Sequence, residues 1–279
     1  MALLHLHEAR TSQLPRHRPK VNGPGADLAG QVEAVGKNVT RFRPGDEVYG
    51  EVATGALAEY ICVPEDAAVI KPTNLTFEQA AAVPMGALTA LQGLRDHGRI
   101  EQGQQVLING ASGGVGTFAI QIAKSFGAEV TGVCSTRNED LVRSIGADRV
   151  IDYTREDFTE GGQRYDLMLD NVGNRSLSEC RRVLRPKGVY LSSFGQPENL
   201  WLGPVAQLLK MMALSAFVSQ SLRSFVATRR QEDLLLMNEL LEAGKVIPVI
   251  DRTYPLTEVA EAFRYLAEGH ARGKVAIIV

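Results

Sequence analysis

The seven residues from Gly110 to Gly116, GASGGVG, carry the strongest chemical signal in the sequence, because four of them are glycines. Ala111, Gly113 and Gly116 have the spacing of the dinucleotide fingerprint, with alanine in place of its first glycine. Small residues at these positions let backbone amides approach a pyrophosphate, and a helix that follows directs the positive end of its dipole at the anion. The segment therefore predicts a nucleotide site.

The same residues also fit a different chemistry. Gly110, Ser112 and Gly114 form a G-x-S-x-G pattern, which is the nucleophile elbow of α/β-hydrolases. His270, with Asp170 or Asp251 before it, would complete the order Ser, Asp, His. An elbow has no need of Gly116, however, and no His-Gly-Gly oxyanion segment lies upstream. A serine hydrolase is therefore kept as the minor alternative.

The flanking sequence predicts the elements that would position this loop. Residues 105–109 form a short apolar run, and 115–126 carry apolar residues three and four positions apart, as on one face of a helix. Residues 130–134 form a second strand-like run. Further alternation follows, with helices over 138–145 and 177–184 and strands over 149–151, 166–170 and 189–193. This order predicts an α/β fold with a doubly wound parallel sheet, in which ligands bind beyond the carboxyl ends of the strands.

The end of the second strand indicates which nicotinamide nucleotide is used. NAD-binding proteins of this kind carry Asp or Glu there for the ribose 2′-hydroxyl. In this sequence Cys134 is followed by Ser135, Thr136, Arg137 and Asn138, so no acid is present and Arg137 is available for a 2′-phosphate. NADPH is therefore favoured over NADH.

The remaining sequence predicts a smaller β-rich module. Strand-like runs over 28–35, 47–52, 58–63 and 68–70 are separated by glycine and proline turns, and a helix begins at Thr76 with a capping box. The final run, 274–279, is apolar after its lysine and is expected to be buried and to pair with this module. A module boundary is expected near residue 85. Residues 1–22 are expected to form a disordered leader or, as an alternative, a weak organelle presequence.

Composition sets limits on the partners and the compartment. The chain has 279 residues, 44% hydrophobic and 22% charged, and a formal net charge of -2, which gives no electrostatic case for binding nucleic acid. Its 3 cysteines are far apart, which favours a reducing compartment, and a cytoplasmic location is expected. The longest apolar stretch, 200–218, is interrupted by Gly203, Pro204 and Lys210, so no membrane span is expected.

Several motifs together resemble one family. They are the segments GADLAGQVEAVGKNVTRFRPGDEVYG, GALAEYICVPEDAAVIKP, AAAVPMGALTALQGL, NGASGGVG, DNVGN and VIPVIDRTYPLTEVAEAFRYLAEGHARGKVAIIV. In this order they are similar to the medium-chain dehydrogenase/reductase superfamily, in its zinc-independent quinone oxidoreductase and zeta-crystallin branch. The resemblance implies a Rossmann domain over 86–245 and a GroES-like catalytic domain over 23–85 and 246–279, with the nicotinamide in the cleft.

The resemblance also implies a set of binding residues. Ser112, Gly113, Gly114, Val115 and Gly116 would hold the pyrophosphate; Ser135, Arg137 and Tyr153 the adenosine end; Asn171, Val172, Ser193, Phe194 and Thr89 the nicotinamide; and Lys274 would lie near the phosphates or the cleft mouth. No zinc is expected, because Gly25-Ala26-Asp27 stands where zinc-dependent relatives have Gly-His-Glu. Tyr49 is the one candidate proton donor.

The activity implied is NADPH-dependent hydride transfer to a quinone or an activated enone, and a homodimer is among the expected assemblies. The sequence departs from the family at its beginning, because residues 1–24 do not match the family's first strands or their Asn-Pro segment. The catalytic domain is therefore expected to be incomplete. A protein that binds NADPH without turnover is the alternative from a different functional class.

Overall fold

The computed structural model describes residues 2–7, 23–193 and 218–279, and the chain divides into two units. Unit 1 comprises Met1–Leu88 and Thr228–Val279, and unit 2 comprises Thr89–Ala227. In the described parts of the chain no helix has the length and apolar character needed to cross a bilayer.

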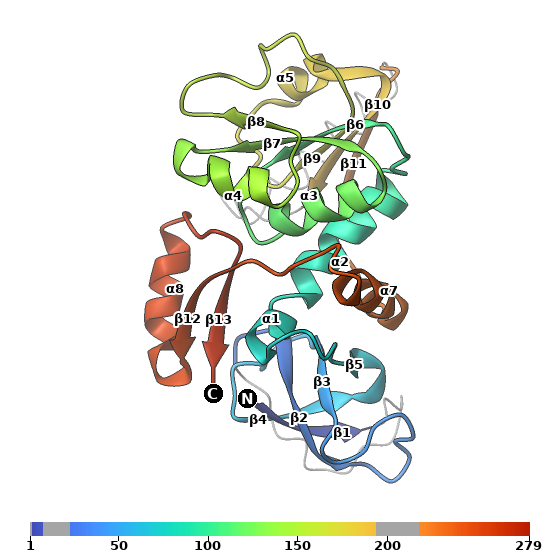
Figure 1. Ribbon diagram of the computed structural model, residues 1–279, viewed down its shortest axis with the longest axis vertical. Helices are drawn as coiled ribbons and strands as arrows, with labels where there is room; N and C mark the ends of the chain where they lie inside the picture. Colours follow the sequence, from blue (N-terminus) through green and yellow to red (C-terminus); the bar gives the residue numbers. More distant parts are fainter. Residues whose placement is uncertain (1, 8–22, 194–217) are drawn as a thin grey trace. The chain divides into compact units, whose positions relative to one another are not determined.

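Unit 2 contains a six-stranded sheet in which every neighbouring pair is parallel (Figure 1). Its strands, in spatial order, are β11 (Ser221–Phe225), β10 (Leu184–Ser193), β9 (Tyr165–Asp170), β6 (Gln105–Asn109), β7 (Glu129–Cys134) and β8 (Arg149–Asp152). The strand of this sheet that comes first along the chain, β6, lies at its centre, and later strands are added outward on both sides. This is the order of nucleotide-binding doubly wound sheets, so the predicted Rossmann fold is confirmed.

Helices cover both faces of this sheet. The helices of unit 2 are η2 (Gly93–His97, a π-helical turn), α3 (Gly116–Ser125), η3 (Thr136–Asn138), α4 (Glu139–Ser144) and α5 (Leu177–Arg182), and α2 (Pro84–Gln92) spans the unit boundary. In Figure 1, α3 and α4 lie against one face and α5 against the other, as right-handed crossovers on either side of β6 require.

The segment β6-α3-β7 folds as its apolar pattern predicts. Val106, Leu107 and Ile108 in β6 and Phe118 and Ile122 in α3 are all 0% exposed. Full burial of such a side chain contributes about 1.5–3 kcal/mol, so this segment anchors the loop that joins β6 to α3.

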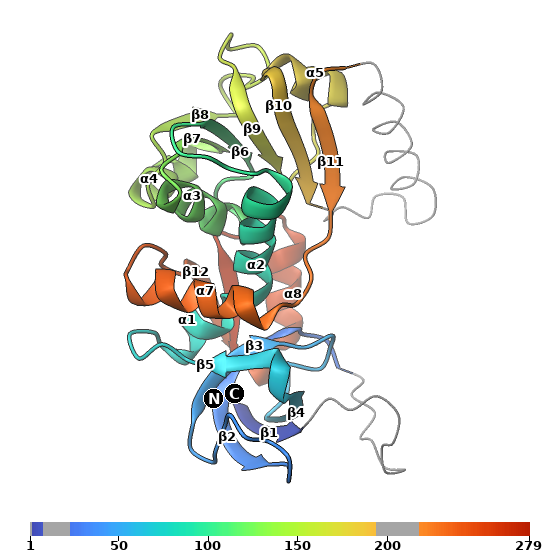
Figure 2. The ribbon, with the colours of Figure 1, turned by 90° about the vertical axis from the view of Figure 1, so that its right-hand side faces the viewer.

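Unit 1 contains a five-stranded sheet, whose strands are labelled in Figure 2. Its order is β4 (Tyr60–Pro64), β1 (Ala2–His7), β2 (Asp27–Val35), β3 (Glu47–Glu51) and β5 (Ala68–Ile70). Strand β1 differs from the expected disordered leader, because it pairs in parallel with both β2 and β4. Main-chain pairing with these two strands holds β1 in the sheet. Residues 8–22 lie outside the described parts of the chain.

The remaining elements of unit 1 are η1 (Glu65–Ala67), α1 (Phe77–Ala81), α7 (Gln231–Glu242), β12 (Ile250–Pro255), η4 (Leu256–Glu258), α8 (Val259–Ala267) and β13 (Lys274–Ile278). The capping box of α1 is present, with Thr76 and Gln79 bonding to each other's amides at 3.2 and 3.0 Å. The end of the chain differs from its prediction. Strand β13 pairs with β12 instead of the five-stranded sheet, and only Ala276 in it is buried.

Helix α7 belongs to unit 1, whereas the sequence placed the second module boundary after it. Two hydrogen bonds explain the difference: the Tyr49 hydroxyl donates to Asn238 Oδ1 at 2.6 Å, and Asn74 Nδ2 donates to the carbonyl of Leu241 at 3.0 Å. Both join α7 to segments that lie far earlier in the chain.

Candidate functional site

The loop between β6 and α3 is folded tightly back on itself. The Ala111 amide donates to the carbonyl of Val133 at 3.0 Å, which fixes the loop to β7, and the Gly113 amide donates to the carbonyl of Gly110 at 3.1 Å. A Cβ at Gly116 would lie 2.1 Å from the Gly110 carbonyl oxygen. Only glycine therefore allows α3 to begin so close to the end of β6.

The beginning of α3 presents unused hydrogen-bond donors. Its N-cap, Val115, makes no side-chain cap. Among the described residues, the amides of Ser112, Gly114, Val115 and Gly116 have no hydrogen-bond acceptor. Uncapped amides at a helix N-terminus, together with the helix dipole, favour an anion. A Cβ at Gly113 would meet its nearest atom only at 3.4 Å, so the loop surface there is open to a ligand.

Most predicted binding residues of unit 2 lie at one edge of its sheet. Ser135 and Arg137 follow β7, Tyr153 follows β8, and Asn171 and Val172 follow β9. Ser193 is the last residue of β10. Because all these strands are parallel, their carboxyl ends meet at the same edge as the β6-α3 loop. The strand order reverses between β6 and β9, and nucleotides bind at such a switch point.

A buried carboxylate organises the switch point. Asp170, which is 1% exposed, accepts hydrogen bonds from Asn109 Nδ2 at 2.9 Å and from the Tyr190 hydroxyl at 2.8 Å. The amides of Val172 and Gly173 also donate to it, at 3.1 and 2.9 Å. Burial and the neighbouring Asp170 raise the pKa of Tyr190 well above its usual range, so its hydroxyl remains protonated. Asp170 therefore fixes the turn that carries Asn171 and Val172.

The structure brings together two of the residues predicted for the nicotinamide end. Ser193 Oγ donates to Asn171 Oδ1 at 2.8 Å, and Asn171 Nδ2 donates to the carbonyl of Asn109 at 3.2 Å. Thr89 is half-buried in α2, and its role at the nicotinamide stays a prediction. Phe194 lies outside the described residues.

Asn138 joins the two loops predicted to hold the phosphates and the ribose. Its Nδ2 donates to Ser112 Oγ at 2.9 Å and to Ser135 Oγ at 3.3 Å. The side chain is 5% exposed, and its Oδ1 is buried with no partner in the described residues. Sequence reasoning missed this residue, because an asparagine after a strand is ordinary loop composition; its position in the second crossover was the available signal.

Asp152 supports the same region from β8. It accepts hydrogen bonds from the Thr136 hydroxyl and from the amide and hydroxyl of Thr154, the latter two at 3.0 and 2.8 Å, and Arg155 lies 3.2 Å away. Burial acts to raise the pKa of Asp152, but these bonds hold it below its usual value. Arg137 and Tyr153, next to two of these residues, are both exposed and can reach a ligand.

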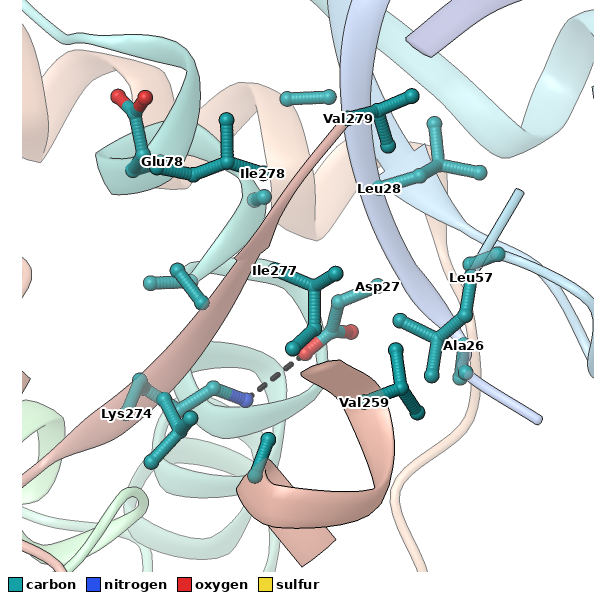
Figure 3. Close-up of a pocket in the computed structure, with 18 of the residues that line it drawn as sticks. Ala26, Asp27, Leu28, Leu57, Glu78, Val259, Lys274, Ile277, Ile278 and Val279 are labelled. Atoms are coloured by element: carbon teal, nitrogen blue, oxygen red, sulfur yellow. Dashed lines mark hydrogen bonds and ion pairs between the residues drawn. The ribbon is translucent and has the colours of Figure 1, made fainter. Parts of the chain in front are cut away.

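Two predicted residues lie in unit 1. Tyr49 is 0% exposed, and burial followed by the nearby Glu242 raises the pKa of its hydroxyl. A buried hydroxyl that already donates to Asn238 is a poor proton donor, so the proposed role of Tyr49 gains no support. Lys274 lines a pocket within this unit, where Nζ lies 2.8 Å from Asp27 Oδ2 (Figure 3). Its role with a nucleotide stays a prediction.

The hydrolase alternative and a metal site receive no support from the geometry. Ser112 Oγ accepts a hydrogen bond from the Asn138 amide group, which cannot act as a general base. In the described ranges, no three His, Cys, Asp or Glu side chains are placed to hold a metal ion. All three cysteines are free, and burial raises the pKa of the Cys134 thiol to about 11.

Two family descriptions match the sequence. Residues 5–73 match the alcohol dehydrogenase GroES-like domain, and residues 145–277 match the zinc-binding dehydrogenase family. The first match begins within the residues expected to form a leader. Together they cover parts of both units.

Curated proteins and a solved structure are similar over most of the chain. A mitochondrial NAD(P)H oxidoreductase of Mus musculus is 37% identical over 91% of this chain and 70% of its own length. A chloroplastic NADPH-dependent alkenal/one oxidoreductase of Arabidopsis thaliana is 36% identical over 91% of this chain and 63% of its own. The quinone oxidoreductase structure from Coxiella burnetii has a TM-score of 0.78 and 29% identity, and the match covers 92% of this chain and 79% of that one.

Proposed function

The chain belongs to the medium-chain dehydrogenase/reductase superfamily, in its zinc-independent quinone oxidoreductase branch, and is an NAD(P)H-dependent oxidoreductase. From this premise we propose that it transfers a hydride from NADPH to a quinone or to an activated enone or carbonyl compound. The observation that carries the proposal is the Gly110–Gly116 loop at the switch point, whose unused amides at the start of α3 suit a diphosphate.

The residues that are present fit the nucleotide. Gly116 leaves no side chain between α3 and β6, so the amides of Ser112, Gly114 and Val115 are open to the diphosphate. At the other end, Asn171 and Ser193, which are hydrogen-bonded to each other, would hold the nicotinamide. Orientation of this kind, rather than a metal ion, would hold the reacting atoms in line. When bound, the reduced nicotinamide would supply the hydride, and a proton from solvent or from another group of the protein would complete the reduction.

NADPH is proposed rather than NADH because of the loop after β7. No acid stands at its tip, where Ser135 and the exposed Arg137 could bond a 2′-phosphate. Asp152 pairs with Cys134 on the neighbouring strand, but its oxygens are engaged by Thr136, Thr154 and Arg155. The Arabidopsis relative is also named for NADPH.

One experiment separates this function from its alternative. The protein is mixed with NADPH and a panel of quinones and enones, while nucleotide fluorescence reports binding and the loss of nicotinamide absorbance reports turnover. Turnover that depends on the acceptor supports the proposal. Saturable binding without turnover of any acceptor supports a nucleotide-binding protein instead, and no binding overturns both. Ser112→Ala is expected to keep turnover, whereas a serine hydrolase would lose its esterase activity.

The relatives' names place them in mitochondria and chloroplasts, so the cytoplasmic location of this chain stays an expectation. A homodimer likewise stays an expectation. The acceptor is proposed to be a small molecule, as the names of these relatives suggest.

A further inference from the structure

Unit 1 contains an apolar pocket with one ion pair in its wall (Figure 3). The pocket has a volume of about 250 Å³ and is lined by the start of β2, the helices α1 and α8, and strand β13. Leu57, Phe77, Phe263 and Ile277 provide much of its apolar surface. Phe263 is 48% exposed, so the pocket is open to ligands at one side. Its residues belong to unit 1 alone.

In this ion pair both oxygens of the aspartate accept hydrogen bonds, whereas the lysine has N–H donors left for a ligand. Asp27 accepts from Lys274 Nζ through Oδ2 at 2.8 Å and from the Met85 amide through Oδ1 at 2.9 Å. The Lys274 ammonium has three N–H donors, and Asp27 is its one hydrogen-bond acceptor within the described residues. Side-chain exposures of 21% and 15% show that both groups are largely removed from water.

These features define the ligand that the pocket can accept. The lining also includes Glu78 and the C-terminal residue Val279, so an anionic ligand would meet carboxylates. A cationic ligand would lie close to the Lys274 ammonium, and either charge would lose water in a largely apolar site, whereas an uncharged ligand meets neither cost. A carbonyl oxygen, in contrast, can accept one of the remaining Lys274 donors. A dry cavity of about 150 Å³ holds benzene, so one of about 250 Å³ suits a compound of two fused rings.

We propose that this pocket binds a flat, uncharged, apolar compound of about two rings, whose carbonyl oxygen accepts a hydrogen bond from Lys274 Nζ. The proposal goes beyond the oxidoreductase function, because binding requires neither the nucleotide nor turnover. It also assigns Lys274 to a site whose described lining residues all belong to unit 1.

The test is calorimetric titration of the full chain, without nucleotide, with two probes that differ in one group. 2-Acetylnaphthalene carries the carbonyl oxygen, and naphthalene does not. We expect 2-acetylnaphthalene to bind about 10-fold more tightly than naphthalene, as a hydrogen bond from a charged donor implies. Lys274→Met should remove this preference, and Lys274→Arg, which keeps the donors, should retain part of it.

Lys124→Met is the matched control, because Lys124 makes a similar ion pair with Asp148 at 2.8 Å in unit 2. It should leave both affinities unchanged. Ala81→Phe would fill the pocket and should abolish binding of both probes while cooperative unfolding is retained. If this variant does not fold, the comparison of the two probes with wild type and Lys274→Met still decides. The proposal is overturned if wild type shows no saturation, or if Lys274→Met keeps the preference for the carbonyl.

Discussion

Asn138 Nδ2 donates a hydrogen bond to Ser112 Oγ at 2.9 Å, and so links the loop after β7 to the loop after β6. The same Nδ2 lies 3.3 Å from Ser135 Oγ. One buried amide thus sets the spacing between the residues proposed for the diphosphate and those proposed for the adenosine end. Because Asn138 is only 5% exposed, we interpret it as a residue that positions the two loops rather than one that contacts the nucleotide.

Asn138→Ala should therefore weaken NADPH binding by about 3- to 10-fold, because loss of a buried hydrogen bond releases both loops. The KM for NADPH should rise while kcat changes little. Nucleotide fluorescence and steady-state kinetics give the two values. In a double-mutant cycle with Ser112→Ala, the two losses should be less than additive, since each removes the same bond. Additive losses, or an equal loss for the control Gln163→Ala at the opposite end of β9, would contradict this role.

Gly116→Ala should disrupt the loop itself. The added Cβ would lie 2.1 Å from the Gly110 carbonyl oxygen and 2.8 Å from Ala111 backbone atoms, which no side-chain rotation relieves. We expect NADPH affinity to fall by at least about 10-fold and the free energy of unfolding by about 2 kcal/mol or more. Urea titration measures the second quantity. Gly161→Ala is the control, because its Cβ would meet no atom within 4 Å and should change neither value.

Arg137→Ala should change nucleotide preference more than overall activity. Removal of a charge-assisted bond to the 2′-phosphate should weaken NADPH binding by about 10- to 100-fold and leave NADH binding nearly unchanged. Parallel titrations with the two nucleotides measure the ratio. Arg149→Ala removes the same charge at the other end of β8, where it bonds Gln163 at 2.9 Å, and should leave the ratio as in wild type. If the affinities for NADPH and NADH fell equally, Arg137 would not be the residue that recognises the 2′-phosphate.

Stability at acid pH should depend in part on Asp148. Burial acts to raise its pKa, but hydrogen bonds from Lys124 at 2.8 Å and from the Val130 amide at 2.7 Å hold it below the usual value. Because the folded-state pKa is lowered, the contribution is complete above the unfolded value of about 3.9 and is lost as pH falls through the folded value.

Asp148→Asn should accordingly lower the free energy of unfolding near neutral pH. The loss should be less than about 1 kcal/mol, because the Lys124 and Asp148 side chains are 34% and 47% exposed. The difference from wild type should shrink below about pH 4. Urea titrations at a series of pH values test this. A difference that stays constant through that range would contradict the assignment.

The sequence was most informative where local pattern and fold agree. The segment β6-α3-β7 was predicted nearly to the residue, because its apolar runs have the periods of a strand and a helix and its glycines mark the tight turn between them. Strands β2, β3 and β5 were found for similar reasons. The residues predicted to bind the nucleotide in unit 2 could be placed at the carboxyl edge once a parallel sheet was expected, but only the structure shows that Asn171 and Ser193 are hydrogen-bonded to each other.

Long-range pairing could not be predicted. Strand β1 lies in a segment of leader-like composition, and its partners, β2 and β4, are identified only by main-chain register. The apolar residues of β13 predict a buried strand, yet β13 pairs with β12 alone and forms part of the wall of a pocket. The sequence named Asp170 only as a candidate for a hydrolase triad and did not single out Asn138, because a single polar residue at a strand end resembles any loop. Their roles depend on neighbours that are about 20 to 60 residues away, as in the Asn109–Asp170 bond.

The most direct test of the central claim is an NMR titration of the ¹⁵N-labelled chain with NADPH. We predict saturable shifts of the amide signals of residues 112–116, with the same dissociation constant that nucleotide fluorescence gives, and smaller shifts with NADH at equal concentration. Saturation by fluorescence without movement of these amides, or no saturation at all, would contradict the account.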